Sequence, residues 1–461
     1  MSGNAVSLRL RSVELYERPV TLRLPFRFGA ATVTHCPQAF VRVQATVGRR
    51  NVEGATAELM VPKWFDKNPA LTHEQNFEQL RQALRLARDA YGAADAPLTP
   101  WAMAESCGTE AITRGTALGL PRLAAQFGAA LLDKAIADAA LRSAATPWVR
   151  GVQAGVLGDP WSPRLRLHET ATVVLRHTVG LADRLRDDEP GPDPQDGLPA
   201  TLEAAIATYG LTHFKLKLCG DIERDATRLG AIATLLQARV QDHHITLDGN
   251  ETFADAEALG RWWQAMAAMP TLQQLLSRTL LLEQPIARAR ALDTPIDGLC
   301  LPMPVILDES DDHADVFERG LALGYRGISS KACKGLYRSL HSAARIAQEP
   351  QRLLLSGEDL TCQAGLAVQQ DTMLAASLGV RHIERNGHHY VDGFGIAPQA
   401  EAQAFADAHP GFYTGAHAAS VSARQRPRLQ VHGGRLDLAS LHVPGFASAV
   451  HPLWSDLQVM P

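Results

Sequence analysis

Three acidic side chains stand at the ends of short apolar runs in the middle of the chain. Asp248 closes ITLDGN, Glu283 closes LLLEQP and Asp308 closes VILDES. A single carboxylate in such a place most often caps a helix, but three in succession favour a shared site. Carboxylate oxygens are the ligands that a hard divalent cation selects, and without a cation the three would raise each other's pKa. We therefore expect a divalent cation here, Mg²⁺ with Mn²⁺ as the alternative.

Lysines flank these acids along the chain. Lys215 and Lys217 precede them in HFKLKL, and Lys331 follows them at the end of GISSK. Residues two apart in a strand point to the same side, so both ammonium groups of the first pair can enter one site. A lone lysine at a strand end usually reaches out to solvent. Lysines on both sides of a cluster of acids instead indicate proton transfer, because nearby positive charge can lower the pKa of an amine toward neutrality.

Two further pairs of polar residues follow later apolar runs. Glu358 and Asp359 end RLLLSGED, where they would either contact the substrate, in particular an amino group, or cap the next helix. His388 and His389 come after the last run, VRHIE, and their roles stay open.

The segment that carries these residues alternates short apolar strands with helical stretches from about residue 170. Eight strands in this segment predict a (β/α) barrel, the TIM-type α/β fold. A doubly wound sheet is disfavoured, since no glycine-rich phosphate motif follows the first strand. The expected strands are ATVVLRHTVG, HFKLKL, HITLDGN, TLLLEQPI, PVILDES, YRGISSK, RLLLSGED and VRHIE.

The ends of the chain predict a second domain. Alternating runs at 8–16 and 38–47 around a turn-rich stretch, followed by helices at 72–91 and 123–144, indicate an α+β capping domain over residues 1–145. The barrel then covers 146–404. Residues 405–461, with two strands expected around Gly433-Gly434, are expected to return to the capping domain.

Composition excludes several classes of protein. The 45 Lys and Arg against 49 Asp and Glu give a net charge of −4 with no basic tract, which argues against nucleic acid and anionic membranes as partners. Six scattered cysteines without a C-x-x-C pair, and no run of 18 apolar residues, favour a cytoplasmic protein. The expected partners are a small carboxylate substrate and further copies of the same chain in a homo-oligomer.

The order of these motifs resembles the enolase superfamily, specifically the muconate-lactonizing-enzyme subgroup of the mandelate racemase/muconate lactonizing enzyme family. The resemblance covers nearly the whole chain. Two departures are a long spacing of 35 residues between Asp248 and Glu283, and Leu336 where a second glycine is common. The matching text is Lys215-Leu-Lys217, Asp248-Gly-Asn250, Glu283-Gln-Pro285, Asp308-Glu-Ser310 and Lys331-Ala-Cys-Lys334-Gly335.

The resemblance implies abstraction of a proton α to a carboxylate, giving an enediolate held by Mg²⁺. Enolase-superfamily sites are a known example of this chemistry, with a Lys or His base and one or two Mg²⁺ ions. Lys217 would be the base on one face, Lys331 the acid or base on the other, and Lys215 a contact to the substrate carboxylate. Asn250 and Lys334 would support the metal site. The mandelate-racemase subgroup is disfavoured, because RLLLSGED ends without histidine.

Several activities fit this set of residues. Lysines on both faces favour a racemase or epimerase, while an acid-sugar dehydratase (a lyase) and a cycloisomerase are the alternatives. A non-catalytic barrel that binds a structural cation is a fourth interpretation. The stretches 25–34 and 55–65, the latter with Trp64 and Phe65, are expected to cover the barrel mouth.

Overall fold

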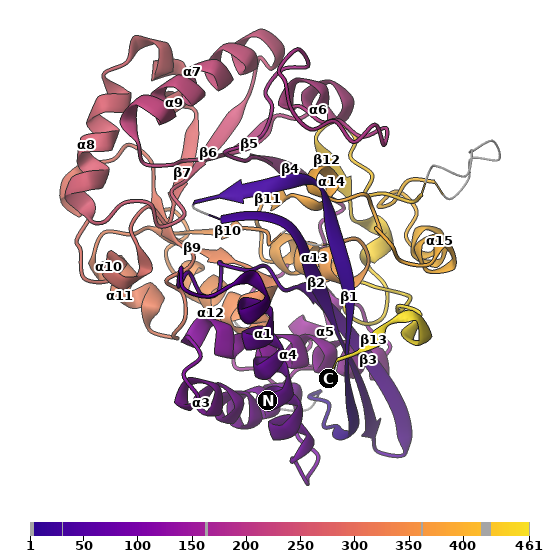
Figure 1. The fold of residues 1–461 in the computed structure, drawn as a ribbon. Helices are drawn as coiled ribbons and strands as arrows, with labels where there is room; N and C mark the ends of the chain where they lie inside the picture. Colours follow the sequence, from indigo (N-terminus) through magenta and orange to yellow (C-terminus); the bar gives the residue numbers. More distant parts are fainter. Residues whose placement is uncertain (1–3, 30, 162–164, 361–362, 416–425, 461) are drawn as a thin grey trace.

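Eight parallel strands close into a barrel in the computed structural model, which describes residues 4–29, 31–161, 165–360, 363–415 and 426–460. Each strand pairs with the next, and the last, β11, pairs with the first, β4, so the barrel has no free edge (Figure 1). The fold class predicted from the alternation of strands and helices is confirmed. The strands are β4 (Thr172–Val179), β5 (His213–Lys217), β6 (His244–Asp248), β7 (Thr279–Glu283), β8 (Val305–Leu307), β9 (Gly327–Ser330), β10 (Leu354–Gly357) and β11 (His382–Arg385).

Helices and short helical turns connect the strands and cover the outside of the barrel (Figure 1). The long spacing between Asp248 and Glu283 contains extra turns, η3 and α9, after α8. The elements are α6 (Leu202–Tyr209), α7 (Ile222–Arg239), α8 (Ala256–Ala267), η3 (Pro270–Leu272), α9 (Gln273–Ser277), α10 (Arg288–Ala291), η4 (Asp297–Leu299), α11 (Val316–Ala322), η5 (Ala332–Lys334), α12 (Leu336–Ile346), α13 (Leu366–Ser377), α14 (Gly387–Tyr390), α15 (Gln399–Ala408), η6 (Ala439–Leu441) and η7 (Trp454–Asp456).

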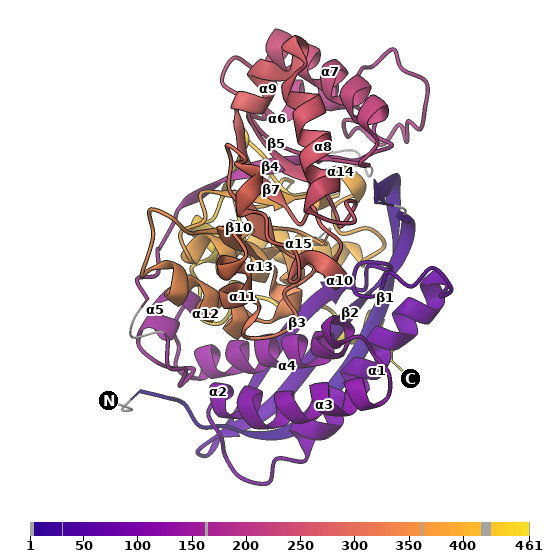
Figure 2. The same ribbon diagram turned by 90° about the vertical axis from the view of Figure 1, so that its left-hand side faces the viewer.

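The N-terminal region forms a three-stranded antiparallel sheet backed by helices, beside the barrel (Figure 2). Helix α4 is buried on nearly all sides because it lies between this sheet and α1. Gly128 of α4 permits the close contact with α1, since a Cβ there would lie 2.1 Å from the carbonyl oxygen of Ala83. The elements are β1 (Arg9–Phe28), β2 (Ala31–Val47), β3 (Arg50–Leu59), α1 (His73–Gly92), α2 (Pro100–Met103), the π-helical turn η1 (Ala104–Gly108), α3 (Thr109–Ala117), α4 (Arg122–Ser143) and α5 (Trp148–Gln153).

The stretch expected to be a turn-rich loop at 25–34 is instead mostly strand. Strand β1 continues to Phe28 and β2 begins at Ala31. Pro25 and Gly29 suggested a turn, but Leu22, Leu24, Phe26 and Phe28 alternate with more exposed residues and are buried. The ring of Phe26 packs on Tyr390 of α14, with centroids 4.5 Å apart, so contact with the barrel holds this hairpin in strand conformation.

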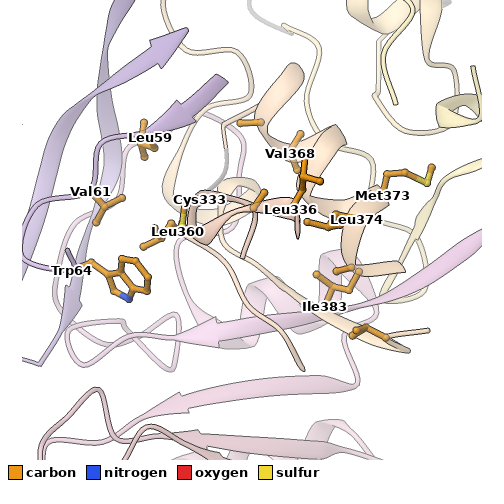
Figure 3. Close-up of a cluster of buried hydrophobic side chains, with 14 of the residues drawn as sticks. Leu59, Val61, Trp64, Cys333, Leu336, Leu360, Val368, Met373, Leu374 and Ile383 are labelled. Atoms are coloured by element: carbon orange, nitrogen blue, oxygen red, sulfur yellow. The ribbon is translucent and has the colours of Figure 1, made fainter. Parts of the chain in front are cut away.

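The capping domain and the barrel share an apolar interface. Figure 3 shows Leu59, Val61 and Trp64, at and beyond the end of β3, facing Cys333, Leu336 and Leu360 of the barrel. All six residues are buried. Beside them Thr56 donates a hydrogen bond of 2.5 Å to Gln370 of α13. This interface fixes the segment after β3 over the barrel mouth.

The C-terminal segment divides between the two parts, which corrects the expectation for its paired strands. Strand β12 (Arg435–Asp437) follows Gly433-Gly434 but pairs antiparallel with β4 of the barrel, because Leu436 is fully buried there. Only β13 (Gln458–Val459) pairs with β1 of the N-terminal sheet. No helix among the described residues has the length and apolar character needed to span a membrane.

Candidate active site

The register of the barrel strands brings the predicted residues to one end of the barrel. Lys217 of β5 pairs with Asp248 of β6, which pairs with Glu283 of β7. Paired residues in a parallel sheet point to the same face, so these side chains and those two positions earlier, including Lys215, enter the barrel. Asp308 directly follows β8 and joins the group through its contact with Lys331, which follows β9.

The ammonium of Lys215 lies at the centre of four carboxylates. Its Nζ is 2.9 Å from Asp248, 2.6 Å from Glu283, 2.7 Å from Glu358 and 2.9 Å from Glu384, and all five side chains are buried. Burial disfavours the ammonium, but the surrounding carboxylates prevail and raise the pKa of Lys215 well above its usual range. Lys215 therefore stays charged and is shared among four acids, of which Asp248 also contacts Lys217 and Glu358 also contacts Arg176.

Glu283 is the acid whose negative charge this arrangement stabilises least. Both of its carboxylate oxygens are buried without a hydrogen-bond partner among the described residues, although one lies 2.6 Å from the Lys215 ammonium at an unfavourable angle. Burial raises the pKa of Glu283 well above its ordinary value, and repulsion from Asp248 and Glu358 adds to the shift. Among the described residues, the shared Lys215 ammonium is thus the one cation in contact with Glu283.

Lys217 and Lys331 lie at the two ends of the acid row. Lys217 donates a 2.6 Å hydrogen bond to Asp248, and Lys331 donates one of 2.5 Å to Asp308, with the strand of Glu283 in between. Each ammonium lies under aromatic rings of the capping domain. The ring of Trp64 is 4.5 Å from Lys331, as expected for a covering segment. Two lysines thus approach one acid row from opposite sides.

The environment of Lys331 is densely paired. Burial opposes its ammonium, but Asp308 and then Glu283 outweigh this effect and raise the pKa of Lys331. Ser329 donates to the other oxygen of Asp308 and accepts a 2.7 Å hydrogen bond from Lys334. Lys334 also lies 2.9 Å from Asp311. Lys334 thus lies within 3.5 Å of Asp308, and its role in supporting a metal site stays a prediction.

Asn250 connects two acids of the site. Its backbone N–H donates to Asp248 at 2.8 Å and its side chain donates to Glu309 at 3.0 Å. The residue adopts φ of 41°, in the left-handed region that asparagine tolerates better than most residues. The predicted supporting role therefore has a geometric basis: Asn250 holds Asp248 in orientation.

Glu358 and Asp359, which were grouped together on the sequence, have different surroundings. Glu358 points into the barrel and contacts Lys215 and Arg176. Asp359 accepts a 2.8 Å hydrogen bond from the backbone N–H of Asn386 and lies 3.7 Å from Arg385. Asp359 is thus turned to the next strand, and these contacts give no support to a role in binding substrate.

Two inward-facing residues were missed on the sequence. Arg176 of β4 bonds Glu358 and the carbonyl oxygen of Gly357, at 3.0 Å for the latter. Glu384 of β11 contacts Lys215 and accepts from Thr178. Both lie inside strands rather than at their ends. Their alternation with apolar neighbours, in VVLRHTV and HIE, is the signal that indicates an inward orientation.

His388 and His389 pack on the outer side of β4, away from the acid row. A ring nitrogen of His388 lies 2.9 Å from His177, and the ring of His389 is 4.9 Å from the same imidazole. His177 follows the inward-facing Arg176 and so points outward. Burial lowers the pKa of all three imidazoles. They are neutral at physiological pH, and these contacts are those of a packed core.

The donor chemistry of the acid row fits a hard divalent cation. Its carboxylates lie on adjacent strands, and the buried oxygens of Glu283 without hydrogen bonds need positive charge. Across the described residues, however, no three His, Cys, Asp or Glu side chains are arranged to hold an ion as they stand. The Lys215 ammonium lies between Asp248 and Glu283. A cation held by Asp248, Glu283 and Asp308 therefore requires Lys215 to shift.

A cavity of about 680 Å³ opens beside Lys217. Phe28, whose ring lies 5.9 Å from the Lys217 ammonium, and Asn250 both line it. The cavity lies between the capping domain and the barrel loops, within the size range of small-molecule sites. Through Phe28, which covers Lys217, and Asn250, which bonds Asp248, the cavity comes close to the Lys217 end of the acid row.

Solved structures of enolase-superfamily enzymes share this fold. The chain superposes on 2-chloromuconate cycloisomerase from Rhodococcus opacus with a TM-score of 0.61 and 16% identity, over 96% of this chain and 97% of that one. An enolase from Bradyrhizobium, complexed with magnesium and mandelic acid, gives 0.61 and 17%, over 96% of each chain. A dipeptide epimerase from Cytophaga hutchinsonii, complexed with Mg and a dipeptide, gives 0.55 and 15%, over 83% and 89%.

At this level of identity the likenesses show that the chain shares the fold of these enzymes, with muconate lactonizing enzymes among its structural neighbours. No model of a known protein family matches the sequence, and no curated protein matches it.

Proposed function

We propose that the protein is a Mg²⁺-dependent enzyme that moves the proton α to a substrate carboxylate, and that it acts as a racemase or epimerase. The observation that carries the proposal is the position of Lys217 and Lys331, each bonded to an outer acid of one carboxylate row and covered by aromatic rings. Structural neighbours that include a cycloisomerase and epimerases, some complexed with magnesium, support the general class.

The reaction needs one proton acceptor and one proton donor. Lys217 accepts the proton when the Cα–H bond breaks, and the electron pair moves onto the substrate carboxylate to give an enediolate. Lys331 donates a proton to the opposite face of the same carbon, so the product is the mirror-image centre. Asp308 and Glu283 raise the pKa of Lys331 in the described structure, which favours its proton-donating form. In the reverse direction the two lysines exchange roles.

The carboxylate row supplies the electrostatics of the reaction. A Mg²⁺ ion held by Asp248, Glu283 and Asp308 would supply the positive charge that an enediolate needs. Asn250 orients Asp248, and Lys334 with Ser329 orients Asp308. Trp64 and Phe28 exclude water from the ammonium groups, which strengthens each charge interaction.

Solvent deuterium exchange tests the proposal across several classes of carboxylic acid at once. Purified protein with Mg²⁺ in D₂O is incubated with single enantiomers of 2-hydroxy acids, N-acyl amino acids and dipeptides, and mass spectrometry follows the α-carbon. We expect one group of compounds to gain one deuterium and to appear as the opposite enantiomer. The control is Arg261→Gln, which changes an exposed arginine on α8 and should behave as the native protein.

The outcomes separate the candidate reactions. A product lighter by one water molecule, with no label in the opposite enantiomer, would replace the racemase by a dehydratase. Label no higher than in the double variant Lys217→Met/Lys331→Met, across the whole set with Mg²⁺ or Mn²⁺, would refute the enzymatic proposal.

A further inference from the structure

The cavity beside Lys217 is lined by segments of both domains. The capping domain contributes Arg27 and Phe28 from the hairpin tip, and Lys63 and Lys67 from the segment after β3. The barrel contributes Arg224 from the first turn of α7, among others. Phe28 also covers the Lys217 ammonium, so the cavity begins one side chain away from the proposed base.

The lining is strongly cationic, in contrast to the net charge of −4 of the whole chain. Among the side chains that line it, Glu251 is the only acid, and it is already neutralised. Its carboxylate bonds Arg288 at 2.6 Å and lies 2.5 Å from Lys67. The Lys63 ammonium donates only to backbone carbonyl oxygens in the described structure. The field in the cavity is therefore positive and favours an anion.

Two of these cations have no acceptor of their own. Within the described ranges, the guanidinium groups of Arg27 and Arg224 make no hydrogen bond or ion pair with a protein group, and both residues are exposed. Other arginines of the described structure do have acceptors: Arg23 bonds Asp196, Arg228 bonds backbone carbonyl oxygens and Arg288 bonds Glu251. The two unbound guanidinium groups thus remain available to a ligand.

We infer that the substrate carries a second anionic group, distant from the reacting carbon, which Arg27 and Arg224 bind inside this cavity. This inference rests on the proposed function for the reacting end of the substrate. A guanidinium binds carboxylate and phosphate alike through paired N–H donors. The shared chemistry is therefore a compact oxyanion at the far end of a carboxylic acid.

Binding of simple acids tests the inference without turnover. Calorimetry at low ionic strength and with Mg²⁺ compares valerate, which has one carboxylate, with glutarate, which has the same chain length and two; screening is weak under these conditions. We expect glutarate to bind about tenfold more tightly, the gain from one charge-assisted contact. Arg27→Gln and Arg224→Gln should each reduce this preference by about threefold, and the double variant should abolish it. Arg261→Gln is the matched control, with no change.

A third compound, 4-phosphonobutyrate, distinguishes the two sources of the anion. Tighter binding than glutarate indicates a phosphorylated substrate, and weaker binding indicates a dicarboxylic acid. Equal affinities for valerate and glutarate, or a preference that survives the double variant, would overturn the inference.

Failure of the inference and failure of the proposed function give different results. If the protein exchanges deuterium only into monocarboxylic acids and shows no preference for glutarate, the inference fails and the catalytic proposal stands. If the glutarate preference depends on both arginines but no acid exchanges, the anion site stands and the catalytic proposal fails.

Discussion

The two lysines at the ends of the acid row occupy unlike surroundings. Lys331 lies against Trp64, bonds Asp308 and is surrounded by the buried pairs of Lys334 and Ser329. Lys217 bonds Asp248 and lies under Phe26 and Phe28, and Phe28 also lines the large cavity. Both ammonium groups are buried, but the Lys331 end, called the closed end, is enclosed by buried pairs, whereas the Lys217 end, called the open end, is separated from the cavity by Phe28.

This difference suggests that the two ends have different functions, proton donation at one and substrate recognition at the other. Groups held by several buried contacts cost no reorganisation at the moment of reaction, so the closed end suits a fixed proton donor. The open end admits the substrate and carries the cations that would select it. Catalysis and recognition would then respond to different mutations, and the predictions below use that separation.

Among changes outside the two lysines, the largest effect is expected at Glu283, the acid between the two ends. Glu283→Gln should reduce deuterium exchange with both enantiomers by about 100-fold to 1000-fold, because both depend on the same electrostatic centre. It should also abolish the rise in melting temperature that Mg²⁺ gives the native protein. Without metal, its unfolding free energy should be no lower, since Gln removes a buried carboxylate whose pKa is raised. A Mg²⁺-dependent rise in the variant equal to that of the native protein would contradict the assigned ligand.

Trp64→Ala tests the closed end. Truncation of a tryptophan that is 2% exposed should lower the unfolding free energy by about 3–5 kcal/mol in chemical denaturation. It should slow the exchange that depends on Lys331 more than the exchange that depends on Lys217. The matched change Phe28→Ala at the open end should show the reverse order. Equal effects of both variants on both enantiomers would remove the distinction between the ends.

The smallest effect is expected from Ser329→Ala, which removes one contact to Asp308 and one from Lys334. The unfolding free energy should fall by about 1–3 kcal/mol, because two buried hydrogen bonds to charged groups are lost. Exchange through Lys331 should fall severalfold while exchange through Lys217 stays unchanged. A loss confined to the enantiomer whose α-proton Lys217 removes would show that Ser329 does not act through Asp308.

Much of the site could be predicted from the sequence, since barrel strands are short apolar runs whose closing residues converge at one end. Asp248, Glu283 and Lys331 were found in this way. Arg176 and Glu384 were not, because a polar residue inside a strand gives no end signal and its orientation depends on register.

The other sequence-based predictions that were wrong failed for a similar reason. Pro25 and Gly29 indicated a turn, but packing on the barrel overrides local propensity and keeps the hairpin extended. The destination of β12 depended on the burial of Leu436 against β4, a long-range contact that leaves no local pattern. The position of the Lys215 ammonium among four acids likewise requires the closed barrel.

The central claim is that Lys217 and Lys331 serve opposite faces of one carbon. Once a substrate is found, Lys217→Met and Lys331→Met are each incubated in D₂O with both pure enantiomers, and label at the α-carbon is followed without waiting for inversion. We expect each variant to lose exchange with one enantiomer by at least about 1000-fold and to retain it with the other, with opposite preferences in the two variants. Loss of exchange with the same enantiomer in both variants, or full exchange with both enantiomers in either one, would contradict the account.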